Sequence, residues 1–334
     1  MIAKNRIYLI AEIGGNHEGD FNYAKKLTKL ACESGVDAVK FQIYSGDTLV
    51  SPVEDPERNK HFKKFELSKN EYIELAKICA SYKVDFTSSI WDSSVIRWID
   101  KFMAFYKIGS GDLTAYPLLK KIATLGKPIV LSTGLSTFDE VKASIEFLQK
   151  VNPIYNSKEN LAVLQCTSMY PIQIEDVNLK VMQRYKNEFG LSCGYSDHTE
   201  GDKAVKQAIN MGADVIELHF TDSRHGKTFR DHKVSFTKDE VSNLVEYIKQ
   251  GDLINGSENK HPLKSEIDSG HTISFRRAVY PSKNIKKGEI LSENNLIVLR
   301  PNHGIDARNY FDILGKRIKR DLSKFEKMEW DDIQ

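Results

Sequence analysis

The feature that most restricts the fold is the alternation of short β-branched runs with amphipathic segments between Arg6 and about Gln250. This alternation is typical of parallel strands joined by crossover helices. Strands are expected to begin near Ile7, Ala38, Val84, Ala104, Pro128, Leu161, Leu191 and Ala213. Eight such units suit a closed (β/α)₈ barrel better than an open doubly wound sheet, which usually has about five or six strands. Residues 1–250 are therefore predicted to form a barrel of this kind.

The pattern changes after about Gly251. Residues 251–270 are polar and contain several turn-forming residues, which is typical of a linker. Residues 271–334 show short strand-like runs, turn signals and a mild excess of Lys and Arg. We expect a small domain there, mainly β or irregular. It could be a cap that only adds stability, or a lid that supplies a cation to an anionic substrate.

Composition argues against several classes of protein. The net charge of +2 gives no overall attraction for nucleic acid or for an anionic membrane. No apolar run reaches the roughly 18 residues of a membrane span, and Met1 leads directly into a strand-like stretch. We therefore expect a cytoplasmic protein that binds neither nucleic acid nor membrane. The cysteines lie far apart within apolar segments, so we interpret them as reduced, buried thiols rather than metal ligands; they are Cys32, Cys79, Cys166 and Cys193.

Polar residues gather where the predicted strands end, and barrel enzymes place their active sites at the carboxyl ends of the strands. A barrel with a purely structural role would not need polar groups at every one of these ends. The residues are Glu12 and Asn16 at the first strand, Lys40 and Gln42 in the second, Lys107, Ser110 and Asp112 at the fourth, Ser132 at the fifth, Ser168 and Tyr170 at the sixth, Ser196 and His198 at the seventh, and Glu217 and His219 in the eighth.

His198 and His219 end neighbouring strands, so their imidazoles could meet at the mouth of the barrel. A single histidine at a strand end is more often a hydrogen-bonded structural residue than a ligand. A converging pair instead favours a metal site. Two imidazoles with an open, oxygen-rich remainder suit Mn²⁺ or a similar divalent ion rather than a closed structural zinc. His198 and His219 are the predicted metal ligands.

Lys40 and Lys107 interrupt apolar runs, and a buried lysine is costly unless it is paired. They could form ion pairs with Glu12 or Asp112. They could also bind a phosphate, because hydroxyl side chains end several strands and the glycines in residues 109–111 let backbone amides approach an anion. Both interpretations could hold, in the free and the liganded protein. Residues 109–111 could also begin a dinucleotide-binding motif, but its third glycine is missing.

Several stretches, in this order, resemble the sialic acid synthase family, whose members join phosphoenolpyruvate to N-acetylmannosamine or to related acetamido sugars. The stretches are residues 11–19, 39–42, 106–111, 131–134, 166–171, 195–199 and 216–220. Residues 285–289 and 299–304 resemble the antifreeze-like (SAF) domain that ends these synthases. The resemblance covers nearly the whole chain and implies a (β/α)₈ barrel at 1–250, a linker at 251–270 and an SAF domain at 271–334.

The resemblance implies a nonulosonic acid synthase and gives the polar residues their roles. His198 and His219 would hold Mn²⁺, which polarises the aldehyde of the open-chain sugar. Glu12 and Asp112 would act in catalysis by stabilising the positive charge that develops and orienting a water. Lys107 would be the third catalytic residue and would hold the phosphate and carboxylate of phosphoenolpyruvate. The implied substrate-binding residues are Lys40, Ser110 and Ser132 around phosphoenolpyruvate, Asn16, Gln42, Ser168, Tyr170, Asp231 and Arg300 around the amino sugar, and Ser196, which is assigned to neither substrate. In such synthases the SAF domain crosses to a partner subunit, so Arg300 would act in trans within a domain-swapped homodimer.

The sequence leaves the acceptor sugar open. The family carries Glu and Asn where this chain has Asp112 and Ser168. One alternative is a synthase for a phosphorylated acceptor, for which Arg224, Lys227 and Arg230 could supply a basic pocket. Another is a non-catalytic sugar-binding protein of surface polysaccharide assembly. The retained histidines, lysines and acidic residues argue against lost turnover.

Overall fold

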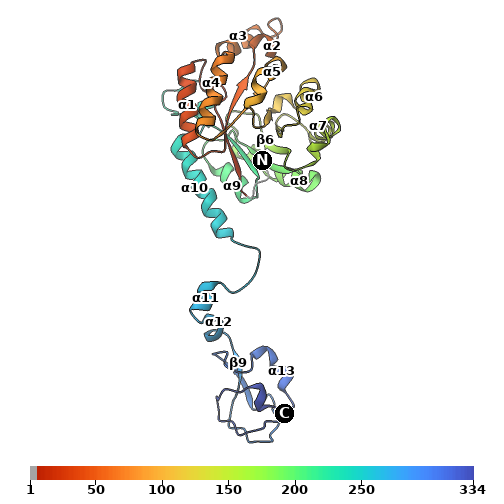
Figure 1. Cartoon of the computed structure of the whole chain (residues 1–334), viewed down its shortest axis with the longest axis vertical. Coiled ribbons are helices and arrows are strands. Elements are labelled where there is room, and N and C mark those ends of the chain that lie inside the picture. Colours follow the sequence, from red (N-terminus) through yellow and green to blue (C-terminus); the bar gives the residue numbers. More distant parts are fainter. Residues whose placement is uncertain (1–5) are drawn as a thin grey trace. The chain divides into compact units, whose positions relative to one another are not determined.

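The first of two compact units is a closed barrel of eight parallel strands, as the sequence predicts. The computed structural model describes residues 6–334, and the units divide at Asn255 and Gly256 (Figure 1). Strand β8 pairs back onto β1, with Glu12 opposite His219. Each strand begins within two residues of its predicted start; the strands are β1 (Tyr8–Glu12), β2 (Ala38–Ile43), β3 (Asp85–Ile90), β4 (Tyr106–Ile108), β5 (Ile129–Ser132), β6 (Leu161–Cys166), β7 (Ser192–Ser196) and β8 (Val215–His219).

Helices connect the strands on the outside of the barrel. They are α1 (Phe21–Glu33), α2 (Gly46–Leu49), α3 (Pro56–Lys64), α4 (Lys69–Ser81), α5 (Ile96–Ile99), α6 (Tyr116–Thr124), α7 (Phe138–Val151), α8 (Lys180–Phe189), α9 (Lys203–Asn210) and α10 (Lys238–Asn255). Short 3₁₀ turns lie between them: η1 (Ser93–Val95), η2 (Asp100–Phe102), η3 (Ser110–Asp112), η4 (Pro153–Asn156), η5 (Ile174–Asp176) and η6 (Arg230–Val234). Helix α1 shows how the apolar periodicity predicts a helix. Ala24, Leu27 and Ala31 share its buried face, and Gly35, with φ +94°, follows its end.

The interior of the barrel has an apolar zone and a polar zone. The apolar zone consists of Tyr8, Ile10, Ala38, Phe105, Val130, Ala162, Leu164 and Val215. Successive strand residues point to opposite faces, so the next inward side chain is two residues further along. At those positions stand buried polar groups: Glu12, Lys40, Lys107, Ser132 and Glu217. The apolar side chains therefore fill the barrel directly below the polar groups, which lie nearer the carboxyl ends of the strands.

The second unit, Gly256–Gln334, has its own small core and a two-stranded sheet, as expected for the C-terminal domain. Strands β9 (Ala278–Pro281) and β10 (Leu296–Leu299) are antiparallel. Its helices and turns are α11 (Lys264–Asp268), α12 (His271–Ser274), η7 (Ala307–Asn309), α13 (Tyr310–Ile313) and η8 (Trp330–Asp332). The segment 251–270, predicted as a linker, contains the end of α10 and all of α11.

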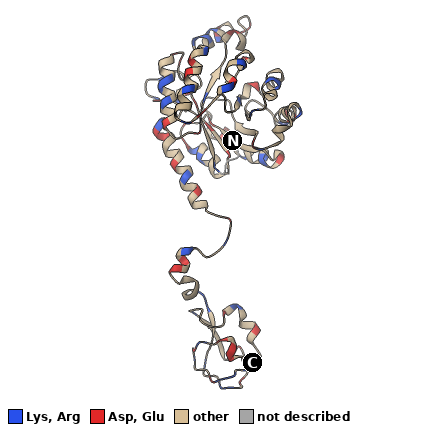
Figure 2. Ribbon diagram, viewed as in Figure 1, with Lys and Arg blue, Asp and Glu red and all other residues tan. Residues whose placement is uncertain are grey.

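Acidic and basic side chains are interspersed on the helices of both units, in keeping with the small net charge (Figure 2). In the part of the chain that the structure describes, none of the helices combines the length and the apolar character that a membrane crossing requires. Cys32, Cys79, Cys166 and Cys193 are all buried free thiols, as predicted.

Candidate active site

His198 and His219 meet at the carboxyl ends of β7 and β8. Their ring centroids are 5.2 Å apart, and Tyr170 packs against both, with its ring 4.0 Å from that of His198 and 5.6 Å from that of His219. Both histidines are buried. The expected convergence of the two imidazoles is therefore present.

The protonation of the two rings fits a metal site. His198 Nδ1 lies 2.9 Å from the carbonyl oxygen of Thr167, and because a carbonyl only accepts, Nδ1 carries the hydrogen and Nε2 keeps its lone pair. His219 Nδ1 is buried without a hydrogen-bond partner among the described residues. Burial lowers the pKa of both imidazoles, which favours the neutral form that binds metals. Among residues 6–334, no group of three or more His, Cys, Asp or Glu side chains is placed to hold an ion.

Lys40 forms a buried ion pair with Glu12, so this predicted pairing is present in the free protein. Gln42, two residues along β2, donates from Nε2 to the other carboxylate oxygen of Glu12 at 3.0 Å. Burial raises the pKa of Glu12 to about 7, even though Lys40 opposes the shift. The carboxyl group therefore titrates in the range useful for proton transfer.

Lys107 has a different partner from the one expected. Its ammonium group donates to Ser132 Oγ at 2.7 Å and lies 3.7 Å from Glu217 Oε2, and the described residues include no ion pair between Lys107 and Asp112. Glu217 also accepts from Ser196 Oγ at 3.0 Å. Burial acts to raise the pKa of Glu217, but the charges of Lys107 and Lys40 outweigh it and the pKa is lowered.

A row of hydroxyl groups borders these lysines at the ends of β4, β5 and β6. Ser110 Oγ accepts from the backbone N–H of Gly134 at 2.9 Å. A Cβ atom at Gly134 would lie 2.4 Å from Ser168 Oγ and 2.9 Å from Ser110 Oγ, so the glycine lets both hydroxyl groups keep these positions. Asp112 follows in η3, where burial raises the pKa of its carboxyl to about 6, against the opposing effect of Lys107. Such a row of donors beside two ammonium groups is suited to an anion.

Asp231 and Asn16 lie together on the loop side of the histidines. Asp231 is buried in η6, its carboxylate accepts from Arg230 Nε at 3.1 Å, and burial raises its pKa. The Arg230 guanidinium lies 4.7 Å from the centre of the Tyr170 ring. Asn16 donates from Nδ2 to Phe220 O and Ser235 Oγ, both at 2.8 Å, and its Oδ1 is buried without a partner among the described residues.

Arg300 is the predicted site residue that lies outside the barrel. It follows β10 in the second unit, where its guanidinium is 5.5 Å from the centre of the Phe275 ring.

Sequence reasoning underestimated Glu217 and Cys166. Glu217 was noted as a polar strand residue without a role, yet it lies beside Lys107 and Ser196. The available signal was its position two residues before His219, which places both side chains on the inner face of β8. Cys166 was interpreted only as core, and its Sγ lies 3.9 Å from His198 Nδ1.

Comparisons with known proteins identify the family of the chain. Residues 27–260 match the NeuB family and residues 276–333 match the SAF domain. The chain is 36% identical to the N,N'-diacetyllegionaminic acid synthase of Legionella pneumophila, over 98% of this chain and 94% of the relative. It is 31% identical to the human N-acetylneuraminate-9-phosphate synthase, over 93% of this chain and 88% of the relative.

A solved structure is also similar. The N-acetylneuraminic acid (sialic acid) synthetase of Leptospira borgpetersenii, in complex with citrate, superposes with a TM-score of 0.72 at 28% identity, covering 80% of this chain and 91% of that one. The family match extends over most of the barrel and the relatives match over nearly the full chain. This chain is a member of the NeuB family, with a C-terminal SAF domain.

Proposed function

We propose that this protein condenses phosphoenolpyruvate with an N-acetylated amino-sugar aldehyde to form a nonulosonic acid, releasing phosphate. The observation that carries the proposal is the burial of two ammonium groups and two neighbouring imidazoles at one end of the barrel. The ammonium groups belong to Lys40 and Lys107, and the imidazoles to His198 and His219. Synthases of this product class are the relatives that the chain matches along most of its length.

Phosphoenolpyruvate is the anion that the lysine side of the site would bind. Lys40 and Lys107 each carry a positive charge in a buried setting, where charge-assisted hydrogen bonds are strong. Ser110, Ser132 and Ser196 add hydroxyl donors at the same strand ends. In the free protein Lys40 pairs with Glu12 and Lys107 lies 3.7 Å from Glu217, and an anionic ligand would take the place of these carboxylates as a partner of the lysines.

The reaction forms one carbon–carbon bond, and at the enol carbon it forms a carbon–oxygen bond to water and breaks the carbon–oxygen bond to phosphate. The double-bond electrons of phosphoenolpyruvate attack the aldehyde carbon, and a positive charge develops at the enol carbon. Glu12 and Asp112 stabilise this charge, and one of them takes a proton from the water that adds there. Loss of phosphate then leaves a keto acid, and the protons of the water end on the new sugar hydroxyl and on phosphate. A divalent ion, for which we propose Mn²⁺, supplies Lewis-acid polarisation of the aldehyde oxygen when His198 and His219 bind it.

The acceptor would lie against the loop side of the histidines, with Asn16, Gln42, Ser168, Tyr170 and Asp231 as its contacts. We favour an unphosphorylated sugar, N-acetylmannosamine or a 2,4-diacetamido-trideoxyhexose. The cations available for a phosphorylated acceptor each lie beside a carboxylate: Arg224 beside Glu240 at 2.8 Å, Lys227 beside Asp222 at 3.9 Å and Arg230 beside Asp231 at 3.1 Å. A second phosphate would have to displace these partners, as phosphoenolpyruvate would those of Lys40 and Lys107.

We further propose a cytoplasmic, domain-swapped homodimer in which Arg300 of one subunit reaches the N-acyl group of the sugar bound in the other. The second unit has its own core and can therefore be exchanged as a body.

Phosphate release is the test. Purified protein with Mn²⁺ and phosphoenolpyruvate should release phosphate only when N-acetylmannosamine or a 2,4-diacetamido-trideoxyhexose is added, and mass spectrometry and NMR should identify the product as a nonulosonic acid. Release only with N-acetylmannosamine 6-phosphate would overturn the unphosphorylated acceptor. No release with any acceptor, together with calorimetric binding of sugar but not of phosphoenolpyruvate or metal, would establish a non-catalytic sugar-binding protein instead.

A further inference from the structure

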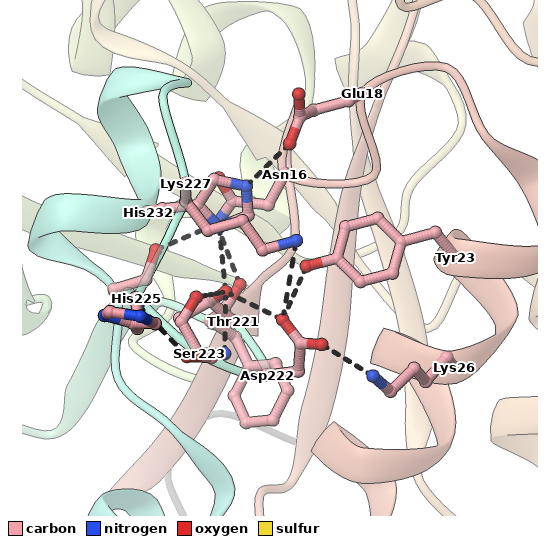
Figure 3. A network of polar contacts seen from close by, with 12 residues as sticks. Asn16, Glu18, Tyr23, Lys26, Thr221, Asp222, Ser223, His225, Lys227 and His232 are labelled. Carbon is pink, nitrogen blue, oxygen red and sulfur yellow. Dashed lines mark hydrogen bonds and ion pairs between the residues drawn. The ribbon is translucent and has the colours of Figure 1, made fainter.

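His232 ties the loop after β8 to the loop after β1 (Figure 3). Its side chain is 1% exposed, and both ring nitrogens have partners: Nε2 lies 3.1 Å from Glu18 Oε1 and Nδ1 lies 2.8 Å from Thr221 Oγ1. Burial lowers the pKa of His232, which favours the neutral ring. In that form Nε2–H donates to the carboxylate, and Nδ1 is an acceptor for the single hydrogen of the Thr221 hydroxyl, which also lies 3.0 Å from Ser223 O.

A second set of contacts fixes the base of the same loop to α1. The carboxylate of Asp222 accepts from the hydroxyl of Tyr23 at 2.6 Å and from Lys26 Nζ at 2.7 Å. Lys227, further along the loop, holds its ammonium group 4.1 Å from the centre of the Tyr23 ring. A parallel bridge between Phe220 and Phe236, with backbone bonds from Thr221 N to Phe236 O at 2.9 Å and from Phe236 N to His219 O at 2.7 Å, joins the two ends of the loop. Between these ends the loop is irregular apart from η6, so side chains supply much of what holds it.

The loop carries Asp231, the residue directly before His232, into the candidate site. Ser235 Oγ donates to the backbone carbonyl of Asp231 at 2.6 Å. The same Ser235 Oγ accepts from Asn16 Nδ2 at 2.8 Å. The Asp231 carboxylate accepts from Arg230 Nε at 3.1 Å, and the Arg230 guanidinium lies 4.7 Å from the centre of the Tyr170 ring, which packs against His198. The position of two proposed sugar contacts therefore depends on how this loop is held.

We infer that His232, Glu18 and Thr221 form a clasp that positions Asp231 for the acceptor sugar. The inference rests on the proposed function, because it concerns the acceptor half of that site. His232 is a positioning residue that acts through Asp231. Release of the clasp would move Asp231 with its loop, whereas Lys40 and Lys107 are carried by β2 and β4 and would stay in place.

Separate KM values for the two substrates test the clasp. His232→Leu removes both hydrogen bonds and Thr221→Val removes one while keeping the shape of the side chain. We expect His232→Leu to raise the KM for the sugar by about tenfold or more, the equivalent of one or two lost hydrogen bonds, and to leave the KM for phosphoenolpyruvate within about twofold. Thr221→Val should act in the same direction with a smaller effect. The sugar is whichever of N-acetylmannosamine and the 2,4-diacetamido-trideoxyhexose the wild type uses.

Tyr155→Phe is the matched control. It deletes a buried hydroxyl that donates to Lys127 O at 2.8 Å, just before β5 and at the opposite end of the barrel. It should lower the Tm and leave both KM values unchanged.

A folded His232→Leu protein with an unchanged sugar KM, or with both KM values raised equally, would overturn the inference. If that variant does not fold, Thr221→Val decides by the same criteria. A wild type that releases no phosphate with either sugar would instead overturn the proposed function, and the inference with it.

Discussion

Replacing Lys107 with Met should separate the structural from the functional role of its charge. Methionine has a similar length and no charge, so it fills the same space on the inner face of β4. Lys107 is buried, donates to Ser132 Oγ at 2.7 Å and lies 3.7 Å from Glu217 Oε2. Lys107→Met therefore leaves a buried carboxylate without its nearest cation.

The size of the loss of stability follows from the unpaired, buried carboxylate of Glu217. Breaking one side of a buried ion pair costs about 3–5 kcal/mol, whereas replacing both members is close to neutral. Lys40 also acts on Glu217 and remains in the variant, so we expect a loss of about 3 kcal/mol of unfolding free energy. The double variant Lys107→Met/Glu217→Gln should recover most of it, since the Gln carbonyl can still accept from Ser196.

Chemical denaturation and titration calorimetry with phosphoenolpyruvate together read out the two roles. Stability should return in the double variant, while affinity for phosphoenolpyruvate should stay at least about tenfold weaker in both variants, because one charge-assisted hydrogen bond is missing. Lys127→Met removes a partly exposed ion pair with Asp100 before β5 and should leave the affinity unchanged. If affinity returned together with stability, Lys107 would only neutralise Glu217 and our assignment would be wrong.

Three further predictions concern other parts of the site. Burial raises the folded-state pKa of Glu12 from 4.5 to about 7, so the stability that this group contributes is fully present below about pH 4.5 and is lost as the pH rises to about 7. Glu12→Gln should therefore reduce the decline of the Tm between pH 5 and pH 8, and the remaining decline should include the contribution of Asp112, whose pKa is raised to about 6. His198→Ala should weaken Mn²⁺ binding and reduce turnover by orders of magnitude with an unchanged circular dichroism spectrum; full activity would remove its metal role. Arg300→Ala mixed with His198→Ala should regain about a quarter of wild-type activity at low sugar concentration, because half of the exchanged dimers each contain one intact site; no recovery after verified subunit exchange would exclude action in trans.

The barrel was predictable because its signal is local. Strand and helix periodicities can be recognised within short stretches of sequence. Side chains alternate between the two faces of a strand, so a polar residue two positions after an inward apolar residue also points inward. The pairs His198 with His219 and Lys40 with Glu12 were also accessible, because they involve neighbouring strands. Sequence order is spatial order in such a barrel.

Contacts across the barrel and within irregular loops were not predictable in this way. Lys107 on β4 meets Glu217 on β8, which is not a neighbouring strand, and only the closed interior brings the two together. The bond between Glu18 and His232 joins residues 214 positions apart through a loop that has no periodic pattern. Side-chain chemistry in such loops depends on distant partners, so local sequence carries little information about it.

The most direct test of the account is a crystal structure of the full chain with Mn²⁺ and phosphoenolpyruvate, with anomalous data collected at the manganese edge. The account predicts a manganese peak at His198 and His219, with the phosphate of phosphoenolpyruvate against Lys40 or Lys107. A peak at another set of residues, or phosphoenolpyruvate bound away from both lysines, would contradict it.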